Sequence, residues 1–172
     1  ARGSRKSGRW RVSGSKSVVV DGHTADFALV AARTQTGIGT FLIENPQAKS
    51  IPSWDGTRKL ASLELDDTPA EPVGPEGDHS AVWRRVVDDA CIALCAELIG
   101  SCERTSDLAV EYARERVQFG RPIATFQVIK HKTVDMLHKL ELARVGTHHA
   151  AWASDTDDPL REEAAAMAKA FV

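Results

Sequence analysis

The hydrophobic pattern divides this chain into two parts with different periods. Between residues 9 and about 66, short apolar or alternating runs such as 10–12, 27–32 and 40–43 are separated by glycine-containing turns. Runs of this length and period predict strands. From Ser80 onward, apolar residues recur every three, four or seven positions, which predicts helices. The pattern therefore predicts an α+β fold, in which an antiparallel β-sandwich or small barrel is followed by up-and-down helices.

The segment between the two parts differs from both in composition. Residues 67–79 contain three prolines and two glycines, a density that predicts a linker without regular structure. We therefore expect a β domain over residues 1–66, a linker over 67–79 and a helical domain over 80–172.

Three helices are predicted in the second part. The first begins at Ser80, whose hydroxyl can cap it, and ends near Gly120, which suits a left-handed C-cap before Pro122. The second runs from about 125 to 154. The third runs from 160 to 172 and still continues at the last residue, so the chain is expected to be a piece of a longer protein. The positions expected to be buried are Val87, Cys91, Leu94, Leu98, Cys102 and Ala109 on the first helix, and Ile129, Leu137, Leu140 and Ala143 on the second.

Composition narrows the class of protein only coarsely. Of the 172 residues, 42% are apolar and 27% are charged, as in ordinary globular proteins. The net charge of −2 gives no reason to expect nucleic acid or an anionic membrane as a partner. No apolar run approaches the roughly 18 residues of a membrane span, and the N-terminal residues lack the apolar middle of a secretory signal.

The three cysteines, Cys91, Cys95 and Cys102, fall on one predicted helix. An odd number on a single helical face favours reduced thiols over a disulfide framework and indicates a cytoplasmic location. The spacing is not that of a zinc site. His131 and His138 lie two turns apart, too far to share one metal ion, so no metal site is predicted.

The richest candidate site is the stretch in which the first helix gives way to the second. Arg116 offers a planar fork of donors that suits a pyrophosphate, and Phe119 offers a flat apolar face. Gln127, in the first turn of the next helix, adds a donor and an acceptor at a positive helix end. Alternatively, Arg116 pairs with Glu111 or Glu115, Phe119 belongs to the core and Gln127 only caps the helix.

This stretch, Tyr-Ala-Arg-Glu-Arg-Val-Gln-Phe-Gly-Arg-Pro-Ile-Ala-Thr-Phe-Gln (112–127), resembles the signature of the acyl-CoA dehydrogenase family. Members of this family are flavoenzymes that oxidise the Cα–Cβ bond of acyl-CoA thioesters. The resemblance implies that Arg116, Phe119 and Gln127 reach across a subunit interface to bind FAD. It also implies that residues 1–66 are part of the middle β domain and that 80–172 are the first part of a C-terminal four-helix bundle.

A second segment resembles the family and then departs from it. Residues 8–16 are similar to its Gly-x-Trp-x-Leu-x-Gly-x-Lys pattern, but Val18 and Val20 stand where members carry a flavin-stacking aromatic residue and a hydroxyl near flavin N5. Valine has neither group, so it cannot make these contacts. The alternative is that residues 18–20 are simply a buried strand.

No catalytic base is identified in this chain. Most members carry the catalytic Glu beyond the position where this chain ends, and a minority place it at the position of Ala90, which cannot act as a base. Asp88 matches an aspartate that many members direct towards the pantetheine of CoA. Alternatively, Asp88 and Asp89 are solvated charges on the helix surface.

The resemblance implies an FAD-dependent oxidoreductase that converts acyl-CoA to 2-enoyl-CoA, in fatty acid or steroid side-chain β-oxidation. It also implies a homo- or hetero-oligomer, expected to be a tetramer. Some actinobacterial members form α2β2 assemblies in which one subunit type has lost part of its active site, and this sequence fits such a subunit. The alternative is a non-catalytic subunit that stabilises a catalytic partner and completes its FAD site.

Overall fold

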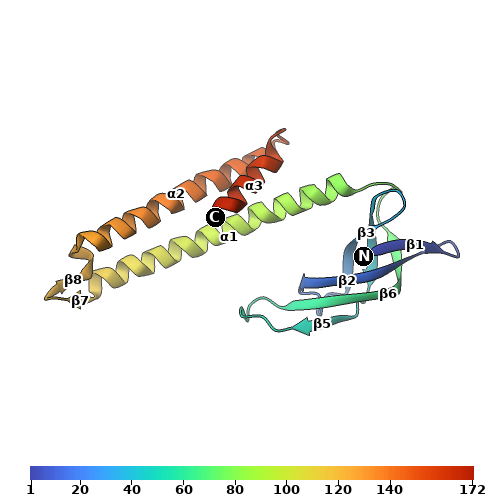
Figure 1. Cartoon of the computed structure of the whole chain (residues 1–172), viewed down its shortest axis with the longest axis horizontal. Coiled ribbons are helices and arrows are strands. Elements are labelled where there is room, and N and C mark those ends of the chain that lie inside the picture. The colour runs from blue at the N-terminus through green and yellow to red at the C-terminus, as the bar shows by residue number, and fades with distance from the viewer. The chain divides into compact units, whose positions relative to one another are not determined.

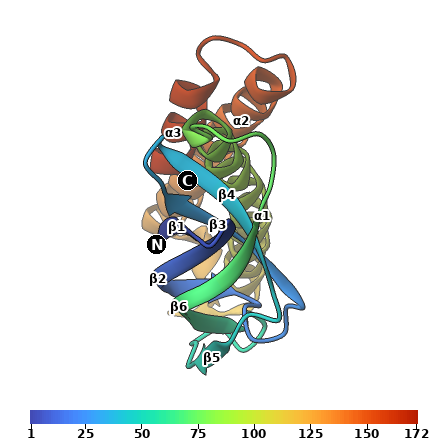
Figure 2. The ribbon, with the colours of Figure 1, turned by 90° about the vertical axis from the view of Figure 1, so that its right-hand side faces the viewer.

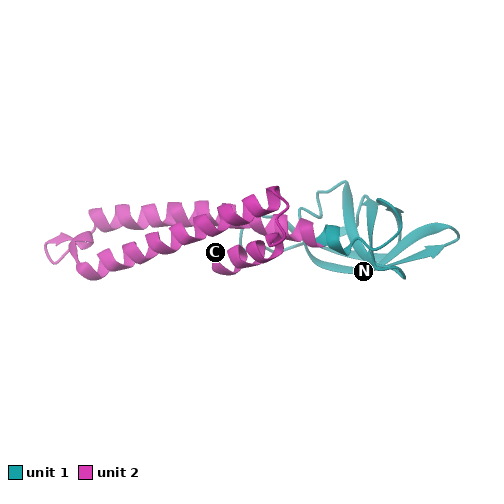
Figure 3. Ribbon diagram, turned by 90° about the horizontal axis from the view of Figure 1, so that it is seen from above, with its two compact units in different colours: residues 1–83 teal, residues 84–172 magenta.

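A computed structural model describes all residues from 1 to 172, and these form two compact units. The first unit covers Ala1–Trp83 and the second covers Arg84–Val172 (Figure 3). No helix of the structure combines the length and the apolar character needed to cross a bilayer.

The first unit is a small barrel with one added strand, and its pairings are antiparallel except for a parallel one between Arg2 and Arg33. In chain order, its strands are β1 (Arg2–Lys6), β2 (Arg9–Val20), β3 (Phe27–Arg33), β4 (Ile38–Glu44), β5 (Ala48–Ile51) and β6 (Leu60–Pro72) (Figure 1). The order in the sheet is β2-β1-β3-β4-β6-β5, and a pairing between β2 and β6 closes the first five strands into a ring (Figure 2). The predicted β fold is thus confirmed in its barrel form.

Alternation along the strands builds the core of the barrel. The buried cluster takes every second residue of β3, β4 and β6, together with one residue of β2. Its members are Val12, Val30, Ala32, Phe41, Ile43, Leu63 and Leu65. Because side chains alternate between the two faces of a strand, the period seen in the sequence is the period of burial.

The predicted linker was wrong over its first half. Strand β6 continues to Pro72, and its register pairs Pro69 with Arg11 of β2 and Pro72 with Phe41 of β4. Proline removes a backbone donor but is tolerated where the ladder does not require that donor. Only residues 73–79 lie between β6 and the first helix.

The start of the first helix is fixed by Asp78 rather than by Ser80. Asp78 Oδ1 accepts hydrogen bonds from the backbone N–H of Ile38, at 2.9 Å, and of Ser80, at 3.2 Å. Asp78 Oδ2 accepts a third from Ser80 Oγ. The turn before β4 contains Gly37, whose φ of +130° is a backbone conformation that residues with a side chain rarely adopt. The carboxylate therefore ties the turn before β4 to the first turn of the helix.

A second polar cluster supports the same turn of the helix. The Nε1–H of Trp83 donates to Thr40 Oγ1 at 3.0 Å, and His79 Nδ1 lies 2.9 Å from that hydroxyl. The other ring nitrogen of His79 lies 2.8 Å from the carbonyl of Pro75, which can only accept, so Nε2 carries the hydrogen. The hydroxyl of Thr40 is then free to donate to Nδ1.

The second unit is a helical hairpin with a third helix packed against it. Its elements are α1 (Ser80–Glu115), whose first turn belongs to the first unit, β7 (Val117–Gln118), β8 (Arg121–Pro122), a 3-10 turn η1 (Ile123–Thr125), α2 (Gln127–Asp155) and α3 (Arg161–Phe171). Helix α2 runs back alongside α1, and the short α3 lies next to both (Figures 1 and 3).

The prediction of which face of α1 is buried was wrong. Its buried residues are Cys95, Ile99 and Ala113, whereas Val87 is 57% exposed and Leu94 is 44% exposed. On α2, Leu140 and Ala143 are buried as predicted, but Leu137 is 57% exposed. Helix α1 is apolar on more than one face, and within this unit α2 and α3 cover only one of them. One buried cluster is built from small residues, which permit close helix contacts. Its members are Cys95, Ala150, Ala153, Ala164 and Ala168.

The three cysteines are free, as predicted, and differ in accessibility. Cys95 is fully buried, and burial raises the pKa of its thiol above the ordinary value, whereas Cys102 is exposed. Thiolate is the reactive form, so iodoacetamide should label Cys102 first in the native chain. Cys95 should react only after unfolding, and peptide mass spectrometry over time would give the order. Equal rates at Cys95 and Cys102 would contradict this packing.

Candidate functional site

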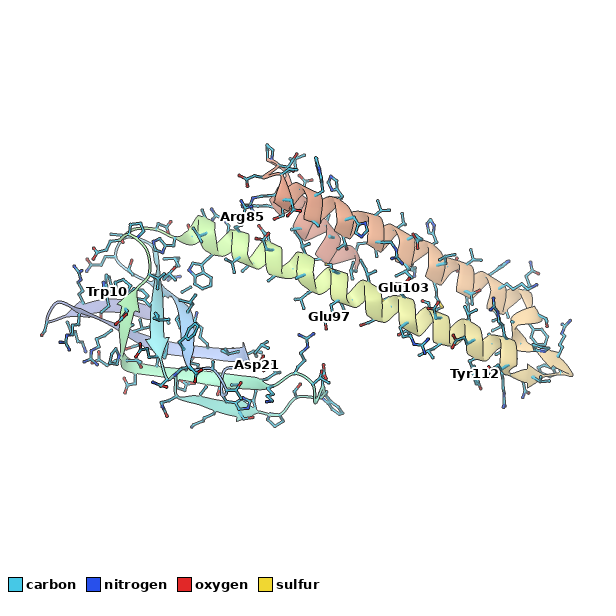
Figure 4. The ribbon with its side chains drawn as sticks, turned by 180° about the vertical axis from the view of Figure 1, so that it is seen from behind. Trp10, Asp21, Arg85, Glu97, Glu103 and Tyr112 are labelled. Carbon is cyan, nitrogen blue, oxygen red and sulfur yellow. The ribbon has the colours of Figure 1, made fainter.

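The stretch 112–127 folds into a tight connection between α1 and α2. Helix α1 ends at Glu115, not near Gly120 as predicted, and Tyr112 lies at this end of the helix (Figure 4). A two-stranded hairpin follows, pairing Val117 with Pro122 and Gln118 with Arg121. Phe119, at φ 53, and Gly120, at φ 75, form its turn. Two successive positive φ values define the hairpin turn that glycine favours, so Gly120 serves this turn and not a helix cap.

The hairpin orders the side chains that follow Arg116. The N–H of Ile123 donates to the carbonyl of Arg116 at 2.8 Å, which extends the pairing by one residue beyond Val117–Pro122. Side chains alternate along each strand and directly paired residues share a face. Arg116, Gln118 and Arg121 therefore belong to the same face of the hairpin.

Arg116 makes no ion pair and is exposed. Glu111, one of its expected partners in the alternative interpretation, lies 3.9 Å from Arg104 instead. No acidic residue occurs from Arg116 to Gln127. The guanidinium fork is therefore available to an anion from outside this unit.

Phe119 is 90% exposed, so the alternative that it belongs to the core was wrong. A non-glycine residue with positive φ is uncommon, and such strain clusters at functional sites. The tip of the hairpin thus holds an aromatic ring in solvent at a strained position, where its face is open to a flat ligand or a partner.

The first turn of α2 completes the candidate site. Its N-cap position is Phe126, which supplies no side-chain cap, so the free N–H groups of this turn keep hydrogen-bonding capacity. The carboxamide of Gln127 is exposed, and its Nε2 lies 3.5 Å from His131 Nε2. A helix start of this kind favours negative charge.

Sequence reasoning missed how Phe126 organises the hairpin. Its ring centroid lies 4.3 Å from the guanidinium carbon of Arg121 and 6.0 Å from the ring of Phe119, which it meets edge to face at 89°. The only signal in the sequence was the aromatic residue directly before Gln127, and periodicity gives it no partner.

Residues 18–20 are not a buried strand, contrary to the alternative considered above. Val18 is 65% exposed and Val20 is 57% exposed, both on β2. Phe27 and Leu29 of β3 are also exposed. The barrel therefore exposes apolar side chains at Val18 and Val20, the two positions where the resemblance led us to expect that flavin contacts are missing.

Asp88 lies in a partly buried ion pair and is not a solvated surface charge. Its Oδ2 is 3.6 Å from Nη1 of Arg161 on α3, and the two side chains are 22% and 16% exposed. Neither atom has a hydrogen-bond partner. The neighbouring Asp89 accepts a hydrogen bond from Ser154 on α2, and Ala90 is exposed.

Arg85, at the start of α1, makes further polar contacts at the end of the helical unit that contains Asp88 and Arg161 (Figure 4). Its Nη1 donates to Asp157, and its Nη2 donates to the carbonyl of Ser154 at 3.2 Å. Arg85 and Arg161 both contact Asp157 in the turn between α2 and α3. These contacts give Asp88 and Arg161 a structural setting at the opposite end of α1 from the hairpin.

Comparison with known proteins gives the class of this chain. The acyl-CoA dehydrogenase C-terminal domain family matches residues 81–172, which is more than half of the chain. Acyl-CoA dehydrogenase IpdE2 of Mycobacterium tuberculosis is 40% identical over 126 residues, covering 73% of this chain and 36% of that protein.

Solved structures agree over nearly the whole chain. Butyryl-CoA dehydrogenase from Megasphaera elsdenii superposes with a TM-score of 0.86 at 29% identity, covering 97% of this chain and 47% of that one. A steroid acyl-CoA dehydrogenase named Tcur3481-Tcur3483 gives a TM-score of 0.85 at 30% identity, covering 99% of this chain and 46% of that one. The chain belongs to the acyl-CoA dehydrogenase family, and it spans between about a third and a half of the length of these relatives.

Proposed function

We propose that this chain is a subunit of an FAD-dependent acyl-CoA dehydrogenase, which oxidises the Cα–Cβ bond of an acyl-CoA thioester to the 2-enoyl-CoA. Membership of the family supports the reaction class. Relatives named for butyryl-CoA and for steroid substrates support fatty acid or steroid side-chain oxidation. In this proposal the chain works in a homo- or hetero-oligomer, a tetramer, in the cytoplasm.

The observation that carries the proposal is the unpaired Arg116 in a turn that has no acidic residue. A diphosphate fits a guanidinium fork bidentately, and the uncapped start of α2 adds N–H donors for the same charge. The ring of Phe119 is open to a flat heterocycle, and Gln127 supplies an amide beside it. FAD, when bound, would accept the hydride, while Arg116, Phe119 and Gln127 would hold and orient it.

The barrel fits the flavin ring less well than the hairpin fits the diphosphate. Val18 and Val20 offer neither a stacking aromatic nor a hydroxyl, although both are exposed. We therefore propose that these contacts, and the catalytic base, come from a partner chain whose FAD this chain helps to bind. The name of one solved relative joins two designations, Tcur3481 and Tcur3483, which is consistent with a two-component assembly.

A second candidate function is a non-catalytic subunit that stabilises a catalytic partner and completes its FAD site. The exposed Ala90 favours it, because no base stands at this position. Asp88 would contact the pantetheine of CoA only through the part of its carboxylate that Arg161 leaves accessible. We also propose that residues 1–66 are part of the middle β domain and that 80–172 are part of the C-terminal bundle. Residues 67–72 extend strand β6, so 73–79 form the connection.

Flavin content and turnover test these proposals. The chain would be expressed alone and together with its partner, and FAD per chain would be measured from the visible flavin absorbance after desalting. We expect little FAD with the chain alone and a retained flavin in the co-expressed assembly. Turnover of acyl-CoA with an artificial electron acceptor should then require both chains.

Each outcome has a distinct consequence. One FAD per chain and full turnover by the chain alone would overturn the requirement for a partner. A co-expressed assembly that retains no FAD would overturn the flavin role of this chain. Flavin that is retained equally when Arg116 is replaced would count against both functions, because in each of them this chain completes the FAD site, and would leave a subunit that only stabilises its partner.

A further inference from the structure

We propose that Arg121, seated on the ring of Phe126, is a second cation of the diphosphate-binding site and determines its preference for a dinucleotide. The inference rests on the proposed FAD role of Arg116. It adds a residue that the sequence pattern did not single out, and it names Phe126 as the positioning residue that holds Arg121 in place.

The hairpin register places Arg121 beside Arg116. Arg121 is paired with Gln118, and Arg116 lies two residues before Gln118 on the same strand direction. Arg116 and Arg121 are therefore diagonal neighbours on one face, a distance that long side chains can span. Two long side chains on one face can each meet one phosphate of a diphosphate, whereas a mononucleotide has only one phosphate to offer.

Phe126 fixes the position of the second guanidinium. The 4.3 Å separation between Cζ of Arg121 and the centroid of Phe126 is a close cation–π contact. Arg121 makes no ion pair, and no carboxylate competes for it between Arg116 and Gln127. Stacking leaves the edge of a guanidinium, where its N–H donors lie, free to meet an anion.

The same ring links this cation to Phe119. The edge-to-face contact between Phe119 and Phe126, with centroids 6.0 Å apart, holds the tip of the hairpin over the start of α2. Removing the ring of Phe126 would release both Arg121 and Phe119. An arginine whose side chain is already ordered loses less entropy when it binds its ligand. The contact between Arg121 and Phe126 should therefore increase affinity even though Phe126 need not touch the diphosphate.

The test compares FAD and FMN binding by the assembled protein, measured by quenching of flavin fluorescence at low and high salt. Arg121→Met should weaken FAD binding about threefold to tenfold and flatten its salt dependence, while FMN binding changes little. Phe126→Leu should weaken FAD binding at least as much, because it also releases Phe119, and Phe126→Tyr should retain wild-type affinity. The double variant, Arg121→Met with Phe126→Leu, should be no weaker than Phe126→Leu alone, because the contact between Arg121 and the ring is already lost in that single variant.

Controls keep this result separate from folding and from the proposed function. Arg9→Met removes an exposed charge from β2 and should leave FAD affinity unchanged. If Arg116→Ala weakens FAD binding but Arg121→Met does not, the second cation is refuted and the proposed function stands. If neither has an effect, the proposed function itself fails. If the losses of FAD affinity in Arg121→Met and Phe126→Leu add up in the double variant, Phe126 does not act by positioning Arg121.

Discussion

Replacing Arg116 with alanine is expected to weaken retention of FAD by the assembled protein about tenfold or more. A charge-assisted hydrogen bond contributes about 1.5–3 kcal/mol, and each 1.4 kcal/mol is a factor of ten in affinity. Arg116 has no ion pair within the chain, so its removal leaves no internal partner unsatisfied. Fold stability should therefore hardly change, and the loss should be confined to ligand binding. Titration of apo-assembly with FAD measures it directly.

Two variants sharpen this expectation. Arg116→Lys keeps the charge but loses the planar fork, so it should recover only part of the lost affinity. Arg114→Ala, two residues earlier in the last turn of α1, removes an equal charge from outside the hairpin and should leave affinity close to wild type. FAD affinity that is unchanged in Arg116→Ala, or equally reduced in Arg114→Ala, would show that Arg116 does not grip the cofactor.

The hydrophobic period of the sequence was enough to predict the class of fold but not the packing of its helices. Alternation at Val30–Ala32 and Phe41–Ile43 translates directly into burial, because a strand has only two faces. On α1, the expected stripe through Leu94 and Leu98 is exposed, while Cys95 and Ile99 are buried. A helix that is apolar on several faces does not reveal which of them its own chain will cover.

Local signals also failed where tertiary pairing overrides them. Prolines at 69 and 72 predicted a break, yet the register with β2 and β4 accommodates both within β6. Gly120 predicted a helix end, but the hairpin pairing of Gln118 with Arg121 uses it in a turn instead. The rule for glycine was correct about the positive φ of Gly120, but the residue lies in a hairpin turn and not at a helix end. The rule for proline missed that both prolines fit an extended strand.

The candidate site was predictable to the extent that a motif names side chains. Arg116, Phe119 and Gln127 were singled out from residue chemistry and from the family signature. The contact between Arg121 and Phe126 was not, because it depends on where the hairpin folds relative to the start of α2. The sequence could suggest Arg116 through its chemistry, but Arg121 could be identified only from the strand register of the hairpin.

Replacing Gly37 with alanine should destabilise the barrel by about 3–5 kcal/mol. A Cβ at this position would lie 2.6 Å from the side chain of Asp78, a separation that real Cβ atoms essentially never show. The backbone at φ +130 adds strain of about 1–3 kcal/mol for a residue with a side chain. Moving Asp78 would also weaken its hydrogen bonds to the N–H groups of Ile38 and Ser80, at roughly 1–3 kcal/mol.

Thermal unfolding followed by calorimetry measures this loss, and Gly56→Ala supplies the matched control. At about 4–8 °C per kcal/mol for a unit of this size, the barrel transition of Gly37→Ala should fall by about 12 °C or more. Gly56 lies between β5 and β6, has no positive φ and has nothing within 4 Å of an added Cβ, so its alanine variant should melt within a few degrees of wild type. Similar melting temperatures for the two variants would mean that the turn before β4 is not anchored to the first turn of α1 through Asp78. A lowered transition in Gly37→Ala alone would support the close packing of this turn against Asp78, which hydrogen-bonds both Ile38 and the first turn of α1.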